Sequence, residues 1–289
     1  MKRYLVPYEG SELSKAALRY AIQFARGVPG AISILFIADE RLLANPLFDI
    51  TVLALQGIGT LGDLLPRERA KLELKARLLA HGDDLLKELA SWPELKPDSP
   101  DPVEYSAKVE SGNPPKLLSD YSENYDVVFM GLWGEMHKYK AGLWGGTSET
   151  VIRRGVCPVF LATGDFKPVD SVIVGFDNRP RSRQALAWAG MIGESMRVPV
   201  DIITSGTDAK WREGVIEEAR EISGSFDTQF TYQQTETHPA KAVLAASSQK
   251  PQALICLGAF GDQPIRELFL GSVAEEVLRH AAAPVLLLK

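Results

Sequence analysis

The sequence predicts an α/β fold built from two similar halves, each with a parallel sheet covered by helices. Short apolar segments alternate with amphipathic segments along the 289 residues, which is typical of strands joined by crossover helices. The order of these segments repeats once. In each half an apolar run, residues 127–130 or 253–257, is followed by glycines and then by a helical pattern. Self-similarity of this length indicates one domain written twice.

The elements of the two halves correspond in order. The first expected strand, residues 4–8, ends at Glu9, and its counterpart, residues 172–176, ends at Asp177. Each is followed by a helix with an alanine-rich apolar face. The second strands are expected at 31–37 and 198–203, and the third strands end near Val109 and Tyr232. The fifth strands are expected at 158–161 and 284–288. Short helices are expected at 115–121 and 239–248, after the third strands.

A short polar segment, residues 163–168, divides the chain into expected domains 1–165 and 168–289. It is too short for free tumbling, so we expect the halves to pack together. The first domain carries an extra segment at about 40–102. Residues 67–89 within it have a charged helical pattern, and residues 42–65 are apolar with three glycines. This insertion is either a cover packed on its own domain or a surface for a partner or a homodimer.

Composition excludes several classes of protein. The chain is 45% apolar and 24% charged, with a net charge of −5, which argues against a nucleic-acid partner. Cys157 and Cys256 each lie in or beside an apolar strand, so we expect buried thiols in a reducing compartment. Neither a signal peptide nor an apolar run of membrane-spanning length is recognisable. We therefore expect a cytoplasmic protein that does not bind membranes.

The second half contains a loop suited to phosphate, with the pattern Gly258-x2-Gly261-x9-Gly271-Ser272. Glycine lets the backbone approach a ligand closely and adopt a positive φ. Ser272 is expected to cap the next helix, with Glu275 completing a Ser-x-x-Glu capping box. Free N–H groups at that helix start, aided by the helix dipole, favour an anion.

Asp177 ends the first strand of the second half at the same expected edge of the sheet, where ligands of open α/β sheets bind. A carboxylate repels phosphate, so we expect it to accept hydrogen bonds from a ribose hydroxyl or a base edge. The alternative is that Asp177 caps the following helix. Arg266, within the loop, either neutralises phosphate charge or is solvated.

The first half carries a less regular version of this site. Glu9 stands where the second half has Asp177, and the loop is one residue longer. Gly146 replaces the serine, so the hydroxyl is lost unless Thr147 supplies it. Trp133 and Trp144 flank the loop, where they either pack, stack on a base or fill the site. Whether the first half also binds nucleotide depends on Glu9, Gly131, Gly134, Gly145, Gly146 and Thr147.

These features together resemble the universal stress protein family in its tandem form. The resemblance covers nearly the whole chain except residues 40–102. It is carried by VPYEGSELSKAALRYA (6–21), ESGNPPKLL (110–118), VVFMGLWG (127–134), RRGVCPVFLA (153–162), ALICLGAFG (253–261) and GSVAEEVLRHAAAPVLLL (271–288). The glycine spacing of the second half is the mark of the family's ATP-binding members.

The resemblance implies a five-stranded, Rossmann-like parallel sheet per half with strand order 3-2-1-4-5, and a pseudo-dimer paired through the fifth strands. It implies ATP with Mg²⁺ as cofactor, with Asp177 on ribose or adenine. Leu257 and Gly258 would line the nucleotide, and Gly261, Gly271, Ser272 and Val273 would hold the phosphates. The family's apolar residue against adenine falls near Ser205, which departs from the pattern.

From this resemblance we expect an ATP-binding regulatory protein of the stress response. Two alternatives remain: a nucleotide-independent interaction or oligomerisation module that uses the insertion, and a slow ATPase. The sequence has no Gly-x4-Gly-Lys-Ser/Thr run, and its four histidines do not cluster. We therefore name no catalytic and no metal-binding residue, and expect at most weak ATP hydrolysis.

Overall fold

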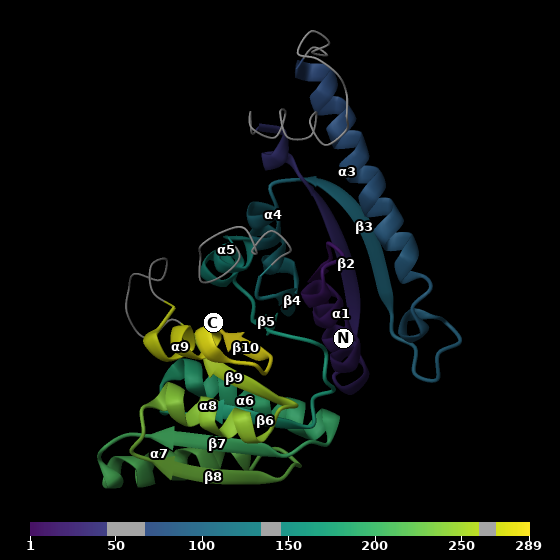
Figure 1. Cartoon of the computed structure of the whole chain (residues 1–289). Helices are drawn as coiled ribbons and strands as arrows, with labels where there is room; N and C mark the ends of the chain where they lie inside the picture. Colours follow the sequence, from purple (N-terminus) through teal and green to yellow (C-terminus); the bar gives the residue numbers. More distant parts are fainter. Residues whose placement is uncertain (45–66, 134–145, 260–269) are drawn as a thin grey trace.

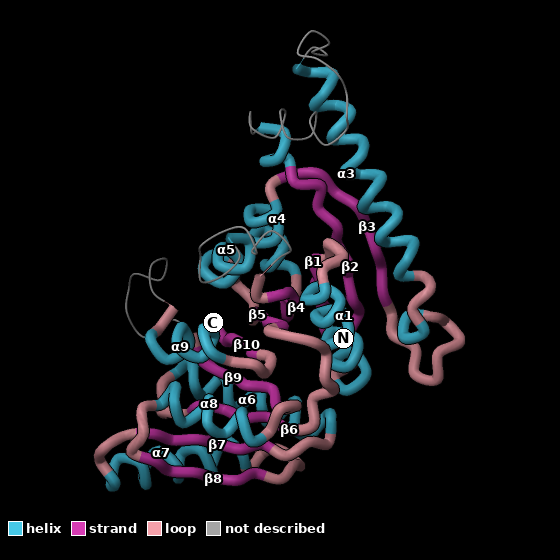
Figure 2. The backbone as a smooth tube through the Cα atoms, viewed as in Figure 1, coloured by secondary structure: helices cyan, strands magenta, loops and turns pink. Residues whose placement is uncertain are grey.

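The computed structural model describes residues 1–44, 67–133, 146–259 and 270–289 (Figure 1). Within them, ten strands form one continuous sheet in the order β3-β2-β1-β4-β5-β10-β9-β6-β7-β8. Each half contributes five strands whose spatial order is 3-2-1-4-5, as the sequence predicts. Figure 2 shows the strands at the two ends of the sheet running in very different directions, as the twist of large sheets requires.

The first half alternates strands and helices in the expected order. Its strand β2 is longer than predicted, because it and β3 stay paired as far as Asp39 and Gly112. The elements are β1 (Lys2–Pro7), α1 (Glu12–Gly27), β2 (Gly30–Asp39), η1 (Glu40–Ala44), α3 (Arg67–Leu89), η2 (Pro93–Leu95), β3 (Tyr105–Gly112), α4 (Pro114–Tyr121), η3 (Ser122–Asn124), β4 (Val127–Gly131), α5 (Gly146–Arg154) and β5 (Val159–Ala162).

The second half repeats this order without the long insertion. All four of its strand-to-strand pairings are parallel. Its elements are β6 (Ser171–Gly175), α6 (Pro180–Met196), β7 (Val200–Ser205), α7 (Ala209–Ser223), β8 (Phe230–Thr235), α8 (Pro239–Gln249), β9 (Ala253–Gly258), α9 (Ser272–His280) and β10 (Val285–Leu288).

The two halves join through their fifth strands. β10 and β5 pair antiparallel, with Leu286 opposite Phe160 at the centre of the contact. This contact confirms the pseudo-dimer that the resemblance implied. It also relates the halves by an approximate two-fold axis, because equivalent residues of the two strands face one another.

Two hydrophobic cores lie on opposite faces of the sheet. One contains apolar residues of α1, α6 and α7, and the other contains apolar residues of α4, α5, α8 and α9. Both cores run across the junction, so each includes residues from both halves. Cys157 and Cys256 are buried free thiols, as expected. Burial raises the pKa of Cys157 to about 11, which keeps it protonated at neutral pH.

Helix α3 occupies the residues for which the sequence predicts a helix within the insertion. It packs on β2 and β3 (Figure 1), where the ring of Phe36 lies edge-on to His81. At Gly82 an added Cβ would lie 2.3 Å from the Phe36 ring, so the helix backbone packs directly against this ring. This part of the insertion covers its own half, whereas most of the apolar stretch of residues 42–65 lies outside the described residues.

In the described portion of the chain, no helix is long and apolar enough to cross a membrane. The same residues contain no group of three or more His, Cys, Asp or Glu side chains arranged to hold a metal ion.

Candidate functional site

The turn between β6 and α6 presents Asp177 at the carboxyl edge of the sheet. Its carboxylate accepts a hydrogen bond from the backbone N–H of Arg179 at 3.1 Å, and 42% of the side chain stays exposed. Asn178, between them, adopts a left-handed φ of 65°. Arg179, not Asp177, is the N-cap residue of α6. The helix-cap alternative for Asp177 is therefore wrong, and the carboxylate is held by the turn with one side facing solvent.

Strand β9 brings Leu257 and Gly258 beside that turn. An added Cβ at Gly175, at the end of β6, would lie 3.0 Å from a methyl group of Leu257. At Gly258 it would lie 2.6 Å from the Cβ and 2.7 Å from the carbonyl carbon of Arg181, in the first turn of α6. Among the described residues Gly258 is not one of those with a positive φ. A glycine is therefore required at position 258 by the close contact between β9 and α6, and not by the backbone conformation.

Helix α9 begins differently from the sequence prediction. Gly271 is its N-cap, with a φ of 97°, and the N–H of Glu275 donates to the carbonyl oxygen of Gly271 at 2.9 Å. Ser272 is therefore the first helical residue, and no side chain caps the helix. The predicted capping box is wrong, because Ser272 lies one position after the N-cap and Glu275 one position after the place where the box needs its acid. Glu275 instead pairs with Arg279 at 3.0 Å.

The uncapped start of α9 is anchored in the same hydrophobic core as the end of β9. Leu270 and Ala274 belong to the same buried cluster as Leu257 and Ala259. Ser272 is exposed and Val273 half-buried, so the first N–H groups of the helix and one hydroxyl are not used by a side-chain cap. Gly261 and Arg266, which the sequence singled out, lie outside the described residues.

An aromatic residue that the sequence analysis missed, Trp211 of α7, lies close to the end of β7. The hydroxyl of Ser205 donates to the carbonyl oxygen of Thr237. Gly206 follows, and an added Cβ there would lie 2.8 Å from the indole ring of Trp211, which is 41% exposed. The sequence feature that could have indicated it is a tryptophan in the first turn of the helix that follows the second strand of this half.

Comparison with known proteins agrees with this architecture. The model of the universal stress protein family matches residues 1–162 and again 168–289. The chain belongs to the universal stress protein family. It is 23% identical over 288 residues to the universal stress protein Slr1230 of Synechocystis, with 99% of both chains covered.

Solved structures of universal stress proteins share the fold. A universal stress protein of Archaeoglobus fulgidus matches with a TM-score of 0.72 at 22% identity, covering 100% of this chain and 96% of its own. A putative one from Pseudomonas aeruginosa matches with a TM-score of 0.64 at 16% identity, covering 100% and 93%. At these identities the likeness concerns the fold alone.

In the first half, the turn between β1 and α1 resembles the turn between β6 and α6 of the second half. Gly10 has a φ of 83°, at the position of Asn178. The difference lies in the neighbouring residue, because the hydroxyl of Ser11 caps α1 and also donates to the Glu9 carboxylate at 2.5 Å. Glu9 is thus held by a short side-chain hydrogen bond, whereas Asp177 is held by a backbone N–H and lies 3.6 Å from the guanidinium of the exposed Arg179.

The first-half glycines also have their counterparts. An added Cβ at Gly131 would lie 2.8 Å from the Cβ of Leu13 in α1, which repeats the contact of Gly258 with α6. Gly146 opens α5 at the position of Ser272, and an added Cβ there would have no atom of the described residues within 4 Å. The hydroxyl of Ser148 donates to the carbonyl oxygen of Leu132. Thr147 is half-buried, and Gly134 and Gly145 lie outside the described residues.

Proposed function

We propose that this universal stress protein binds ATP, with Mg²⁺, at the second-half site and that binding regulates its conformation or assembly. The observation that carries the proposal is the start of α9. Gly271 opens the helix at a positive φ, no side chain caps it, and the exposed Ser272 hydroxyl is the first side chain beyond it. Such a helix start offers oriented N–H groups to a phosphate.

The residues around this helix start support the same ligand. Leu257 and Gly258 supply an apolar edge, and Asp177 has an exposed carboxylate for a ribose hydroxyl or a base edge. Gly261, Gly271, Ser272 and Val273 would hold the phosphates. We infer that the indole ring of Trp211 stacks on the adenine, because it lies at the end of β7, where Ser205 provides no apolar surface.

The first half supports binding less well. Its helix start lacks the hydroxyl at Gly146, and the Glu9 carboxylate is engaged by Ser11. We therefore infer one nucleotide per chain, and domains at residues 1–165 and 168–289 with different roles. No catalytic residue is proposed, and a homodimer of the whole chain stays a prediction.

Equilibrium dialysis of the purified full chain against ATP and Mg²⁺ tests this function, with nucleotide-free protein prepared by unfolding and refolding. Saturable binding in the micromolar range, roughly −8 kcal/mol, is expected. No binding at millimolar ATP would remove the proposal. Phosphate release measured on the same samples separates binding from slow hydrolysis: a rate equal to that of the Gly271→Val protein means binding only.

A further inference from the structure

The start of α6 carries positive charge where a helix ordinarily avoids it. Residues 179–183 read Arg-Pro-Arg-Ser-Arg, and the first turn of this helix contains no acidic residue. The start of a helix is the positive end of its dipole, so cations there are unfavourable and anions are favoured. The equivalent helix of the first half, α1, begins instead with Glu12. The three arginines therefore do not serve the stability of the helix.

Two of these arginines contact acidic residues of their own half. The guanidinium of Arg179 lies 3.6 Å from the carboxylate of Asp177. Arg183 donates to the carboxylate of Glu218, in α7, at 3.0 Å. These ion pairs account for the arginines on either side of Arg181 and leave the role of Arg181 itself to be explained.

Arg181 lies against the first glycine of the loop. An added Cβ at Gly258 would lie 2.6 Å from the Cβ of Arg181. The Cα–Cβ bonds of a helix tilt towards its N-terminus, and α6 begins at the carboxyl edge of the sheet. The Arg181 side chain therefore starts beside Gly258, at the edge where ligands of open α/β sheets bind.

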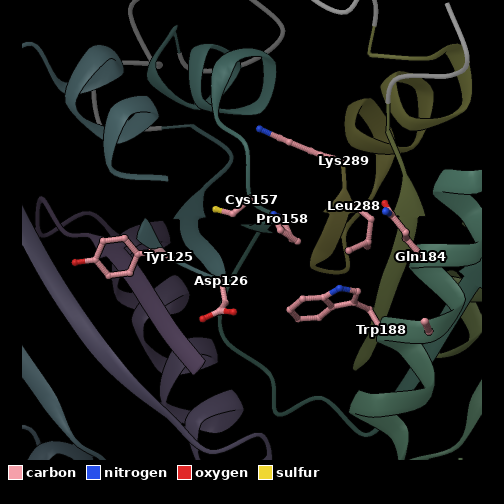
Figure 3. Close-up of a pocket in the computed structure, with 9 residues that line it drawn as sticks. Tyr125, Asp126, Cys157, Pro158, Gln184, Trp188, Leu288 and Lys289 are labelled. Atoms are coloured by element: carbon pink, nitrogen blue, oxygen red, sulfur yellow. The ribbon is translucent and has the colours of Figure 1, made fainter. Parts of the chain in front are cut away.

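The guanidinium of Arg181 contacts a neutral group one turn further along α6. It donates to the side-chain oxygen of Gln184 at 3.2 Å. Figure 3 shows Gln184 beside Leu288 of β10, and both residues line an open cavity of about 410 Å³ at the junction of the two halves. Pairs of arginine and phosphate are frequently bidentate and stronger than a bond to an amide oxygen, so a phosphate near Gly258 would displace Gln184 from this contact.

Positive groups belong to both layers of helices that flank the end of β9. Helix α6 contributes to one hydrophobic core and α9 to the other, on the opposite face of the sheet. The start of α9 offers N–H groups that no side chain caps. Gly258 ends β9 between these two layers. A phosphate chain crossing this end of the sheet would meet backbone N–H groups on one side and a guanidinium on the other.

The first half has an apolar residue at the corresponding position. An added Cβ at Gly131 would lie 2.8 Å from the Cβ of Leu13, so Leu13 stands to Gly131 as Arg181 stands to Gly258. Packing between the fourth strand and the helix therefore does not require arginine. The arginine occurs in the half that also has the serine and the exposed carboxylate.

We propose that Arg181 binds the phosphates of the nucleotide in the second-half site, and that this residue contributes to the difference between the halves. The inference rests on the proposed binding of ATP. It adds a side-chain cation to the backbone N–H groups and the Ser272 hydroxyl, and it makes the site selective for nucleotides over nucleosides.

Arg181→Gln tests this inference against a matched control, Arg183→Gln. Each change removes one positive charge from the same helical turn, so a difference between them reports direct contact with the ligand. Equilibrium dialysis should show ATP binding weakened about tenfold or more by Arg181→Gln. Arg183→Gln should change it by less than about threefold, because screening weakens the effect of a charge that does not touch the ligand. Adenosine, which has no phosphate, should bind equally to the parent and to Arg181→Gln.

A structural role for Arg181 is checked on the same proteins without nucleotide. The urea midpoint of Arg181→Gln should be unchanged or higher, because the change removes a cation from a helix start. Arg181→Met, which keeps the aliphatic stem, serves if Arg181→Gln does not fold by circular dichroism. Equal ATP affinities of Arg181→Gln and Arg183→Gln, or a parallel loss of adenosine binding, would overturn the inference and leave the proposed function standing. Failure of the parent protein to bind ATP would overturn both.

Discussion

Gly258 lies against Arg181 so closely that any side chain at this position would collide with the backbone of α6, since an added Cβ would lie 2.9 Å from the Arg181 carbonyl oxygen. The first half repeats the relationship between Gly131 and Leu13. A glycine at the end of the fourth strand is therefore an architectural requirement of each half, independent of any ligand.

Gly258→Ala should lower the free energy of unfolding by about 1–3 kcal/mol, because the helix backbone must move to admit the methyl group. Gly131→Ala should cost less, because the nearest backbone atom lies 3.2 Å from its added Cβ, compared with 2.7 Å at Gly258. Urea denaturation of both proteins measures the difference. Gly146→Ala is the control and should be near neutral, because no atom of the residues that the structure describes lies within 4 Å of the added Cβ. A near-neutral Gly258→Ala would show that the strand and helix are not packed this tightly.

Ser272→Ala should weaken ATP binding by about 1–2 kcal/mol through the loss of one hydrogen bond to phosphate. It should leave the unfolding free energy within about 0.5 kcal/mol of the parent, because Ser272 does not cap α9. A serine that did cap the helix would cost about 1 kcal/mol on replacement. Calorimetric titration with ATP and urea denaturation of the same protein decide between the two roles.

Ser11→Ala is the contrasting change, because the Ser11 hydroxyl does cap α1 by accepting from the N–H of Ser14 at 3.2 Å. We expect a loss of about 1 kcal/mol of stability and no loss of ATP affinity. A fall in affinity equal to that of Ser272→Ala would show that the first half binds nucleotide after all.

Trp211→Ala should weaken ATP binding by about 1–3 kcal/mol, the range for a base stacked on an aromatic ring. Trp211→Phe should retain most of the affinity. Quenching of tryptophan fluorescence by ATP, compared between the parent and these proteins, provides an independent signal. Unchanged affinity in Trp211→Ala would place the adenine elsewhere.

Tyr8→Phe should leave stability unchanged or raise it by about 1 kcal/mol, because the Tyr8 hydroxyl is buried with no hydrogen-bond partner in the described structure. The second half uses Phe176 at this position. Tyr4→Phe is the control and should destabilise, since the Tyr4 hydroxyl donates to the carbonyl oxygen of Val28 at 2.8 Å.

The same tyrosine predicts a dependence on pH. Burial, with Glu88 and Glu9 nearby, raises the pKa of Tyr8 from 10.0 to about 12. The unfolded chain therefore loses this proton first, and stability should fall as pH rises from 10 towards 12. Tyr8→Phe should make the fall shallower in urea denaturation across that range. An unchanged slope would mean that the Tyr8 hydroxyl is hydrated in the folded protein.

The sequence alone predicted the strand order, the duplication and helix α3, because these depend on hydrophobic periodicity and on resemblance. It misplaced the start of α9 by one residue. A serine followed three residues later by glutamate matches a capping box, but the positive φ of Gly271 shifts the cap, and no local pattern shows φ. The Gly258–Arg181 contact depends on residues distant in the chain, so local patterns could not predict it.

We propose that one half of this duplicated fold binds the nucleotide. Equilibrium dialysis with radiolabelled ATP, applied to the parent protein and to Asp177→Ala and Glu9→Ala, tests it most directly. The account predicts one ATP per chain, weakened by Asp177→Ala and unaffected by Glu9→Ala. Two equivalent sites per chain, or affinity lost on replacing Glu9 and kept on replacing Asp177, would contradict it.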